Sequence, residues 1–545
     1  MGKLKRKLAA LLLSAAAVLT VGAYSPSADV SADTPGVSVS SVSPSATLAA
    51  PKISAYYVPT DTAIKVTWQG VTGADGYLIY RRYNAGSSWV YAGAAGASAR
   101  NFTDKGLKSC TKYQYIMRAY KLTNGKKVGG TFSNVINSTT RPSREVITGV
   151  SVVNSTTVRL SWEKRAGLGY QIYMKKSTDS GWTRRATIAD PSKLSVNVTK
   201  LSPSTKYYFM VRAYTRDAGT CLQMGYFSSP RGATTPAATP YELHGKLSVK
   251  GANIVDKNGN VFKIKGMSTH GIMWEDYRNI LSVASQKVLR DDWKCNTVRI
   301  AMYTEEWGGY TTGSANAATA KNRVIAGVNN ATSLGMYAVI DWHVLSDQDP
   351  RKHQAEAVAF FTDMAKRYKG QYNVIYEICN EPNGSVNWNS GIKSYCQAVV
   401  SAIRKYDSHA IIICGTGTWS QDIDQVLGSR LSDSNCVYAL HFYANTHTDW
   451  LRNRLQSCYN SGLPVLVSEF GTCDASGNGG FNASQTKTWL TLLDKLGIGY
   501  INWSASGKSE TASAFLPGTD LKAIKAGESQ LTESGKLVRA WYRAH

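Results

Sequence analysis

The sequence lacks the short motifs of several common kinds of site. It has nine cysteines but no Cys-x-x-Cys pair, and it has no His-Glu-x-x-His segment, so nothing indicates a structural zinc site or a zinc protease. Seven of the nine cysteines follow residue 240, several inside apolar runs, which is typical of small buried thiols and not of a disulfide framework. We expect no metal site and no cofactor.

Long apolar runs are also missing from most of the chain. After residue 23 none approaches 18 residues, so no membrane-spanning helix is predicted there. Before it, a basic segment precedes the apolar stretch from Leu8 to Val21, as in a secretory signal peptide. We predict a signal peptide over residues 1–23 and a flexible linker, rich in Ser, Ala and Pro, over 24–50. The protein is then expected to be secreted and extracellular, with no membrane contact.

Acidic residues are scarce in one half of the chain. The formal net charge is +25, and residues 51–235 hold 27 Lys/Arg against 8 Asp/Glu, whereas residues 236–545 hold 31 against 27. The near-neutral half suits an uncharged substrate. The basic half can attract an anionic cell-wall polymer, or it can be only a solvated spacer. No groove-reading motif accompanies the charge, so nucleic acid is not expected.

The basic half contains an internal repeat with a period of about 94 residues. The paired positions are Trp68 and Trp162, Gly76-Tyr77 and Gly169-Tyr170, Ile79-Tyr80 and Ile172-Tyr173, Tyr113 and Tyr207, and Arg118-Ala119-Tyr120 and Arg212-Ala213-Tyr214. Short alternating strands in units of this size predict two all-β sandwiches. These residues resemble fibronectin type III modules, which we place over 51–141 and 142–235.

Residues 236–545 alternate apolar strands with helical stretches, which favours a parallel sheet closed as a (β/α)8 TIM barrel of the α/β class. The strands are expected to end near His270, Tyr303, His343, Glu381, Thr416, Tyr443, Gly471 and Ser504. Amphipathic helices are expected over 355–368, 395–406 and 485–496. An open doubly wound sheet is the rival, but Gly415-Thr416-Gly417 lacks the glycine-rich phosphate turn that such a sheet uses.

Two glutamates follow apolar strands at the end of the barrel where catalytic groups belong. Glu381 lies in Asn380-Glu381-Pro382 after Val374-Ile375-Tyr376, and Glu469 follows Val465-Leu466-Val467. Two carboxyls at that end can act as general acid and nucleophile in glycoside cleavage. Polar or aromatic residues also end the neighbouring strands. Arg299 can keep an adjacent nucleophile ionised.

Residues 241–545 resemble the endoglucanases (cellulases) of glycoside hydrolase family 5, a retaining family. The segments that carry the resemblance are 244–251, 265–271, Gly417-Thr418-Trp419-Ser420-Gln421-Asp422 and Asn502-Trp503-Ser504. It implies that Glu381 is the acid/base and Glu469 the nucleophile of an endo-1,4-β-D-glucanase. It further implies a substrate site of Arg299, Asn380, His343, His441, Tyr443, Trp503, His270, Trp274, Trp419, Tyr303, Lys508 and Glu510.

Two other kinds of function fit the same sequence: a different glycosidase built on the same barrel, or a binding protein whose barrel is inactive. An endo-β-1,4-mannanase or a xylanase would need the same two glutamates, and a wall-attached adhesin could carry a vestigial barrel. No cellulose-binding module or dockerin repeat is evident, so we expect activity on soluble or amorphous β-1,4-glucan by a monomer. Trp293, Trp450, Trp489 and Trp541 lie in helical runs, where we expect them to pack in the core.

Overall fold

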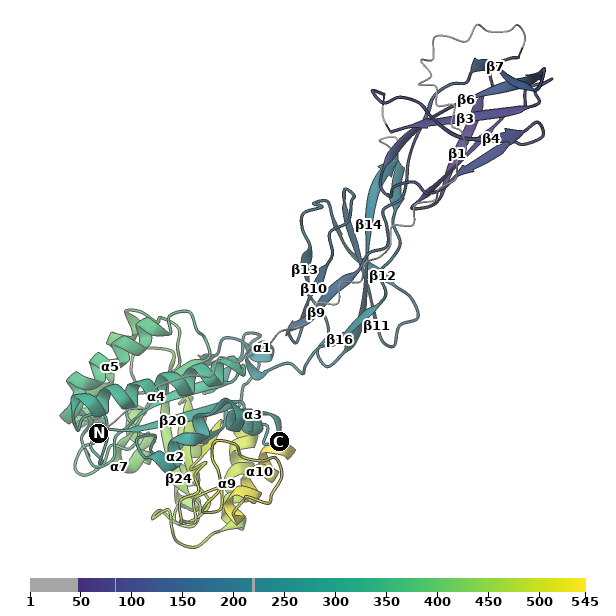
Figure 1. Cartoon of the computed structure of the whole chain (residues 1–545). Coiled ribbons are helices and arrows are strands. Elements are labelled where there is room, and N and C mark those ends of the chain that lie inside the picture. Colours follow the sequence, from purple (N-terminus) through teal and green to yellow (C-terminus); the bar gives the residue numbers. More distant parts are fainter. Residues whose placement is uncertain (1–47, 84, 218–220) are drawn as a thin grey trace, which may run out of the picture.

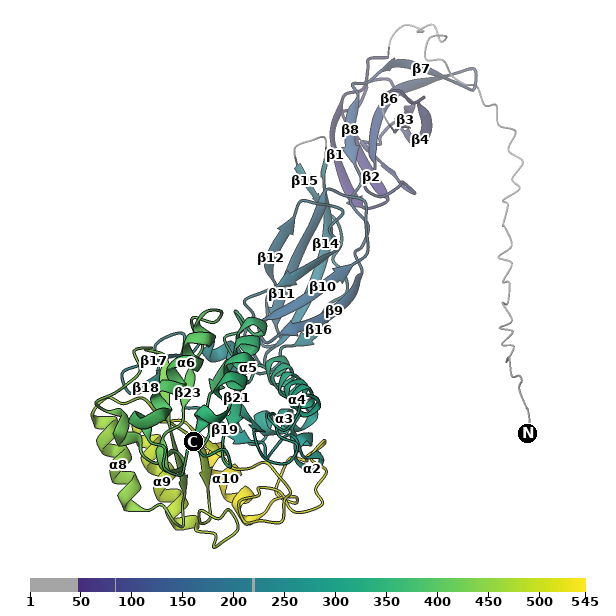
Figure 2. The ribbon, with the colours of Figure 1, turned by 90° about the vertical axis from the view of Figure 1, so that its left-hand side faces the viewer.

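The structure, a computed structural model, describes residues 48–83, 85–217 and 221–545. The signal peptide predicted over 1–23 and nearly all of the linker predicted over 24–50 lie outside these residues. The described part is elongated, with two sandwiches in line and a barrel at one end (Figures 1 and 2). No helix within the described residues is both long and apolar enough to span a membrane.

The first sandwich packs a three-stranded sheet, in the order β1-β2-β5, against a larger sheet in the order β4-β3-β6-β7, with β8 beside β6. Its strands are β1 (Ile53–Thr60), β2 (Ala63–Trp68), β3 (Gly76–Arg82), β4 (Val90–Gly96), β5 (Asn101–Asp104), β6 (Lys112–Thr123), β7 (Lys126–Phe132) and β8 (Ile136–Thr139).

The second sandwich repeats this topology, with β13-β10-β9 facing β12-β11-β14-β15 and β16 beside β14. Its strands are β9 (Ile147–Asn154), β10 (Thr157–Trp162), β11 (Gly169–Lys176), β12 (Thr183–Ile188), β13 (Ser195–Val198), β14 (Lys206–Asp217), β15 (Cys221–Met224) and β16 (Arg231–Thr234). The repeat read from the sequence is therefore a repeat of the fold.

The repeated residues occupy matching places in the two cores. Trp68 packs on Tyr77 with ring centroids 5.2 Å apart, and Trp162 packs on Tyr170 at 5.3 Å. On the outer face, the Arg118 guanidinium lies over aromatic rings in the first sandwich, as Arg212 does in the second. These contacts explain the period of the sequence, because each unit needs the same buried aromatic pair to join its two sheets.

A short helix, α1 (Pro240–His244), joins the second sandwich to the barrel. Thr239 caps it and forms a capping box with Glu242, whose carboxylate also accepts a hydrogen bond from the Ser155 backbone N–H of the second sandwich. The Tyr241 N–H bonds to the carbonyl of Gly335, just before the first residue of β21. The connector is thus fastened at the amino ends of the barrel strands.

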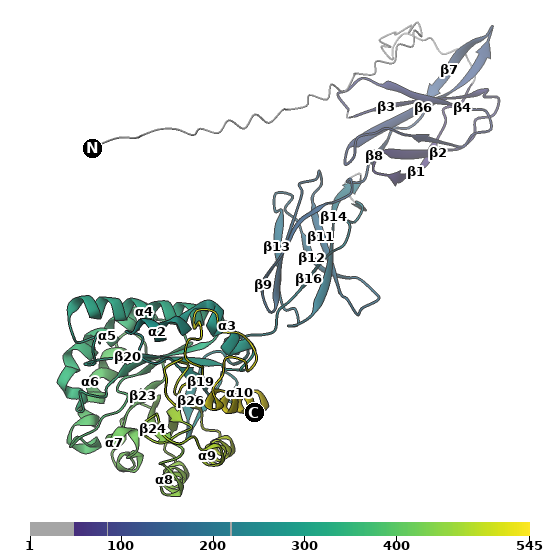
Figure 3. The same ribbon diagram turned by 60° about the horizontal axis from the view of Figure 1, so that its bottom comes forward.

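The barrel is closed by eight parallel strands in sequence order (Figure 3). They are β19 (Lys265–Ser268), β20 (Thr297–Tyr303), β21 (Tyr337–His343), β22 (Val374–Glu377), β23 (Ile412–Cys414), β24 (Cys436–Tyr443), β25 (Val465–Gly471) and β26 (Tyr500–Asn502). A hairpin of β17 (Ser248–Lys250) and β18 (Asn253–Val255) precedes them. Leu247, Ile254 and Phe262 pack against the side chains that fill the barrel.

Helices surround the strands, as Figure 3 shows. They are α2 (Glu275–Arg278), α3 (Val283–Asp291), α4 (Ser314–Ser333), α5 (Gln354–Arg367), α6 (Lys393–Arg404), α7 (Gly417–Ser420), α8 (Asp449–Asn460), α9 (Ala483–Leu496) and α10 (Glu533–Ala544). The predicted fold class is confirmed, and α5, α6 and α9 begin and end within two residues of the predicted helices. The seven cysteines of the barrel are buried free thiols, as expected.

Candidate active site

The site lies where the eight strands end. Four strands end at the predicted residue, namely Tyr303, His343, Tyr443 and Gly471, and the other four end two to four residues earlier than predicted. Glu381 lies beyond β22, but its N–H donates to the Val344 carbonyl at 3.1 Å and so continues the pairing with the neighbouring strand segment. Both glutamates are thus held on the same end of the barrel, within reach of one substrate.

Both carboxyl oxygens of Glu469 accept hydrogen bonds. Arg299 Nη1 donates to Oε2 at 3.0 Å, and the Tyr443 hydroxyl donates to Oε1 at 3.0 Å. Gly471 makes room for this arrangement, because a Cβ at that position would overlap the Tyr443 ring. Two donors fix the direction of the carboxylate, as a nucleophile requires.

Glu381 is held by a histidine. Its Oε1 lies 2.9 Å from His441 Nδ1, and His441 Nε2 lies 3.0 Å from the Ser468 hydroxyl. Burial lowers the pKa of His441, but hydrogen bonds to Glu377 and Glu381 outweigh it and raise the pKa to about 9. The raised pKa favours the protonated ring, which donates to Glu381 and orients that carboxyl.

One oxygen of Glu381, one oxygen of Glu469 and one nitrogen of His441 lie within 4.8 Å of one another. These are ligand types that a metal ion can use, and the same closeness serves a pair of catalytic carboxyls. Two carboxyls this close leave little room for a water between one of them and a bound sugar, which is the arrangement that direct attack on the sugar needs.

Arg299 is fully buried at the bottom of the site and contacts three acidic residues. Besides Glu469, its Nε donates to Glu377 at 2.6 Å, and its Nη2 lies 3.1 Å from Asp341. Burial would raise the pKa of Glu377, but Arg299 and His441 lower it to about 2. Asp341 and Glu377 were not predicted. A lone charged residue in each otherwise apolar strand was the signal available for them.

Asn380 and His343 lie beside this cluster. Asn380 Oδ1 accepts from Arg299 Nη2 at 2.6 Å, and its amide nitrogen lies 3.3 Å from His343 Nε2. Burial and the charge of Arg299 lower the pKa of His343 to about 3, so its ring is neutral. The ring stacks on Trp503 with centroids 5.2 Å apart. A neutral imidazole and an amide can each bond a sugar hydroxyl.

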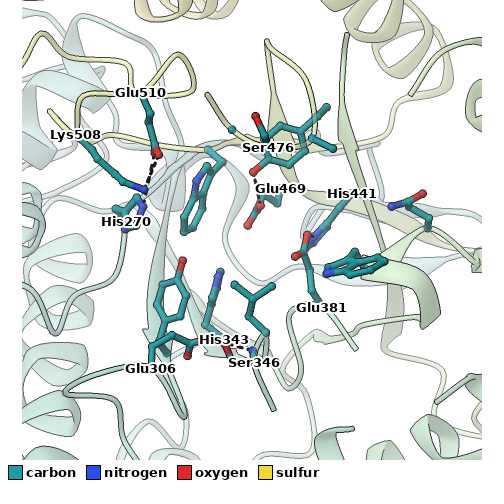
Figure 4. A pocket seen from close by; sticks show the side chains of 18 of the residues that line it. His270, Glu306, His343, Ser346, Glu381, His441, Glu469, Ser476, Lys508 and Glu510 are labelled. Atoms are coloured by element: carbon teal, nitrogen blue, oxygen red, sulfur yellow. Dashed lines mark hydrogen bonds and ion pairs between the residues drawn. The ribbon is translucent and has the colours of Figure 1, made fainter. Parts of the chain in front are cut away.

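A cleft of about 750 Å³ opens above these groups (Figure 4). Twelve of the fourteen predicted site residues line it, and the other two, Arg299 and Asn380, are buried beside its floor. The lining ones are His270, Trp274, Tyr303, His343, Glu381, Trp419, His441, Tyr443, Glu469, Trp503, Lys508 and Glu510. The structure thus brings every predicted site residue into one place.

The two ends of the cleft differ. At one end Lys508 pairs with Glu510 at 2.6 Å beside His270, and burial lowers the pKa of His270 to about 3 (Figure 4). At the other end Trp419 stands 46% exposed on a turn in which Thr418, Trp419 and Ser420 all have positive φ. Backbone strain of this kind persists at functional sites, here to hold an indole over the cleft.

The fold and this site define a glycoside hydrolase. A (β/α)8 barrel presents two glutamates in a cleft lined by aromatic rings, and one glutamate is hydrogen-bonded to a histidine and the other to an arginine. The family model of cellulase (glycosyl hydrolase family 5) matches residues 255–509, and that of the fibronectin type III domain matches 145–220. This chain belongs to glycoside hydrolase family 5. The resemblances stated from the sequence are confirmed, as is the prediction of an enzyme.

Relatives and solved structures agree with this placement. Over 311 residues the chain is 45% identical to Endoglucanase N of Pectobacterium atrosepticum, a match covering 56% of this chain and 68% of the relative. It is 42% identical to an endoglucanase of Clostridium saccharobutylicum over 54% and 64% of the two lengths. The catalytic domain of a Thermobifida fusca endoglucanase in complex with cellotetraose matches with a TM-score of 0.53 at 35% identity, over 56% of this chain and all of that domain.

Proposed function

We propose that this protein is a secreted endo-β-1,4-glucanase that cleaves internal bonds of cellulose and related β-glucans with retention of configuration. The proposal rests on two glutamates that lie close together in the cleft. Arg299 and Tyr443 bond the two carboxyl oxygens of Glu469, and His441 bonds the carboxyl of Glu381. The endoglucanase relatives support glucan as the substrate, and the signal-like segment over 1–23 supports secretion.

The first half of the reaction forms a covalent glycosyl-enzyme. Glu469 attacks the anomeric carbon while Glu381 gives its proton to the leaving oxygen. Arg299 and Tyr443 hold the attacking carboxylate, and Asn380 is placed to donate to the sugar 2-hydroxyl. The bond to the leaving chain breaks as the bond to Glu469 forms.

In the second half, Glu381 is a carboxylate and takes a proton from water, which opens the bond to Glu469. Two inversions give net retention. His343 is placed to bind a hydroxyl of the cleaved sugar. Trp274, Trp419 and Trp503 offer rings to the apolar faces of pyranoses, and Tyr303, His270, Lys508 and Glu510 offer polar atoms in the same cleft.

The test combines substrate choice with stereochemistry. Hydrolysis of carboxymethylcellulose, mixed-linkage β-glucan, mannan and xylan should be measured side by side, with Glu469→Gln as the inactive control. We expect glucans to be cleaved best, and proton NMR of fresh cello-oligosaccharide hydrolysis to show the β-anomer first. A preference for mannan or xylan would favour the alternative enzymes, an α-anomer first would refute retention, and no hydrolysis at all would favour an adhesin.

For the basic sandwiches we propose attachment to an anionic cell-wall polymer. The excess of Lys and Arg over residues 51–235 supports this, and exposed charges of this kind are screened by salt. The full-length protein should be retained on wall material at low salt and released as salt rises. A version lacking 51–235 should not be retained. Binding that is absent or insensitive to salt would leave these units as spacers.

A further inference from the structure

The loop between β20 and α4 carries the most exposed large apolar side chain of the described residues. Trp307 is 83% exposed, whereas Trp419, which lines the cleft, is 46% exposed. Folding normally gains free energy by removing an indole from water, and at Trp307 this gain is left unused. Because the loop lies next to the cleft, this indole is available to stack on a sugar that extends out of the cleft.

The loop is fixed, so the exposure of Trp307 does not come from a loose segment. Trp274 Nε1 donates to the Trp307 carbonyl at 3.1 Å, and the Ser346 N–H donates to Glu306 Oε1 at 3.1 Å. Gly309 permits the tight turn, because a Cβ there would overlap the carbonyls of Thr304 and Glu306. The backbone therefore presents the indole of Trp307 to solvent in a defined position.

The loop also continues the cleft. Glu306 lines the cleft itself, beside His343 and Ser346 (Figure 4), and Trp307 lines a neighbouring hollow of about 560 Å³. Trp274 joins the two, because it lines the cleft and bonds to the backbone of Trp307. The other residues of the hollow include Met273, Thr312, Asn316 and Thr319, a mixture of apolar and hydroxyl or amide groups that suits a sugar.

We propose that Trp307 forms a distal sugar-binding subsite for the β-1,4-glucan chain, beyond Trp274 and outside the cleft proper. The indole of Trp307 stacks on the apolar face of one glucopyranose unit of a chain that leaves the cleft past Trp274. This assignment rests on the proposed function. It makes the enzyme prefer long chains, because only a chain that extends past Trp274 reaches the loop.

The test is a chain-length series with the full-length protein. The kcat/KM of Trp307→Ala relative to the unmodified enzyme should be measured on cellotetraose, cellopentaose and cellohexaose. We expect the loss to grow with length and to reach about tenfold on cellohexaose, at least five times the loss on cellotetraose. Trp307→Phe, which keeps a ring, should recover part of it. Titration of cellohexaose into the inactive Glu469→Gln protein should show the same weakening when Trp307→Ala is added.

A matched control is Tyr372→Ala. Tyr372 is 43% exposed and lies just before β22, at the opposite end of the barrel, so its removal should not change the length dependence. Equal losses on all lengths for Trp307→Ala would assign the indole a structural role and overturn the proposal, as would no loss on cellohexaose. If the unmodified enzyme cleaves mannan and not glucan, the proposed function fails, and the same series with manno-oligosaccharides decides the subsite separately.

Discussion

In the first sandwich a buried carboxyl pairs with a partly exposed cation, whereas the barrel buries the cation itself among three carboxyls. In the first sandwich, Arg81 pairs with Asp104 at 2.5 Å but remains 29% exposed. In the barrel, Arg299 is fully buried and contacts Asp341, Glu377 and Glu469. Burying both partners of an ion pair costs free energy, which the Arg81–Asp104 pair reduces by leaving the cation partly in water and which a catalytic site accepts, because the charges orient and activate its nucleophile.

The largest expected effect is on catalysis and should be confined to the barrel. Glu469→Gln removes the nucleophile while keeping the shape of the side chain, so hydrolysis of carboxymethylcellulose should fall by about 10³-fold or more. Circular dichroism and the melting temperature should change little. Glu469→Gly should regain cleavage of an activated β-glucoside in azide and give the α-azide. If Glu469→Gln still hydrolysed the substrate, Glu469 would not be the nucleophile.

The next effect contrasts the two arginines. Arg299→Met leaves buried carboxyls without their cation and should lower the free energy of unfolding by about 3–5 kcal/mol. Arg81→Met should cost only about 1–2 kcal/mol, because Asp104, although buried, keeps a hydrogen bond from Tyr115, and Arg81 is itself partly exposed. Urea denaturation of both variants measures the difference. Equal free-energy costs would show that the buried cluster depends on its cation no more than the Arg81–Asp104 pair does.

A pH-dependent effect should come from His441. Its pKa is about 9 in the folded protein against an ordinary value of 6.5, so its contribution is complete below pH 6.5 and disappears as pH rises through 9. We expect the gap in unfolding free energy between the unmodified protein and His441→Gln to shrink by about 3 kcal/mol over that range. A gap that stays constant with pH would mean that His441 is not charged in the folded state.

The smallest effect is expected from removing the sandwiches. They have their own cores, and the barrel has its own, so deletion of residues 51–235 should change kcat/KM on soluble glucan by less than about twofold. Reducing-sugar assays on carboxymethylcellulose test this. A larger loss of activity would mean that the sandwiches contribute to catalysis and are more than an attachment.

Much of this organisation could be predicted because it rests on local pattern. The repeat of Trp68 and Trp162, the alternation of strands and helices, and the strand-end positions of Glu381 and Glu469 are all visible in the sequence. What could not be predicted depends on three-dimensional burial. Asp341 and Glu377 face inward only once the barrel closes, so their role in holding Arg299 appears only in the structure.

The tryptophans show the same limit. Trp489 is fully buried and Trp541 packs against the core, as predicted, but Trp450 is 47% exposed, so its assignment to the core was wrong. It lies at the start of α8, where its ring contacts His447 and the Arg454 guanidinium in place of the core. Helical periodicity says which face a residue lies on, but not whether the first turn of the helix is covered.

The attachment of α1 at the amino ends of the strands has a consequence for how a polysaccharide chain reaches the cleft. The cleft opens at the carboxyl ends, so the connector and the cleft mouth lie at opposite poles of the barrel. A polysaccharide chain can then enter the cleft without passing the two sandwiches. If the sandwiches are bound to a surface, the cleft still opens toward the side of the barrel that is away from it.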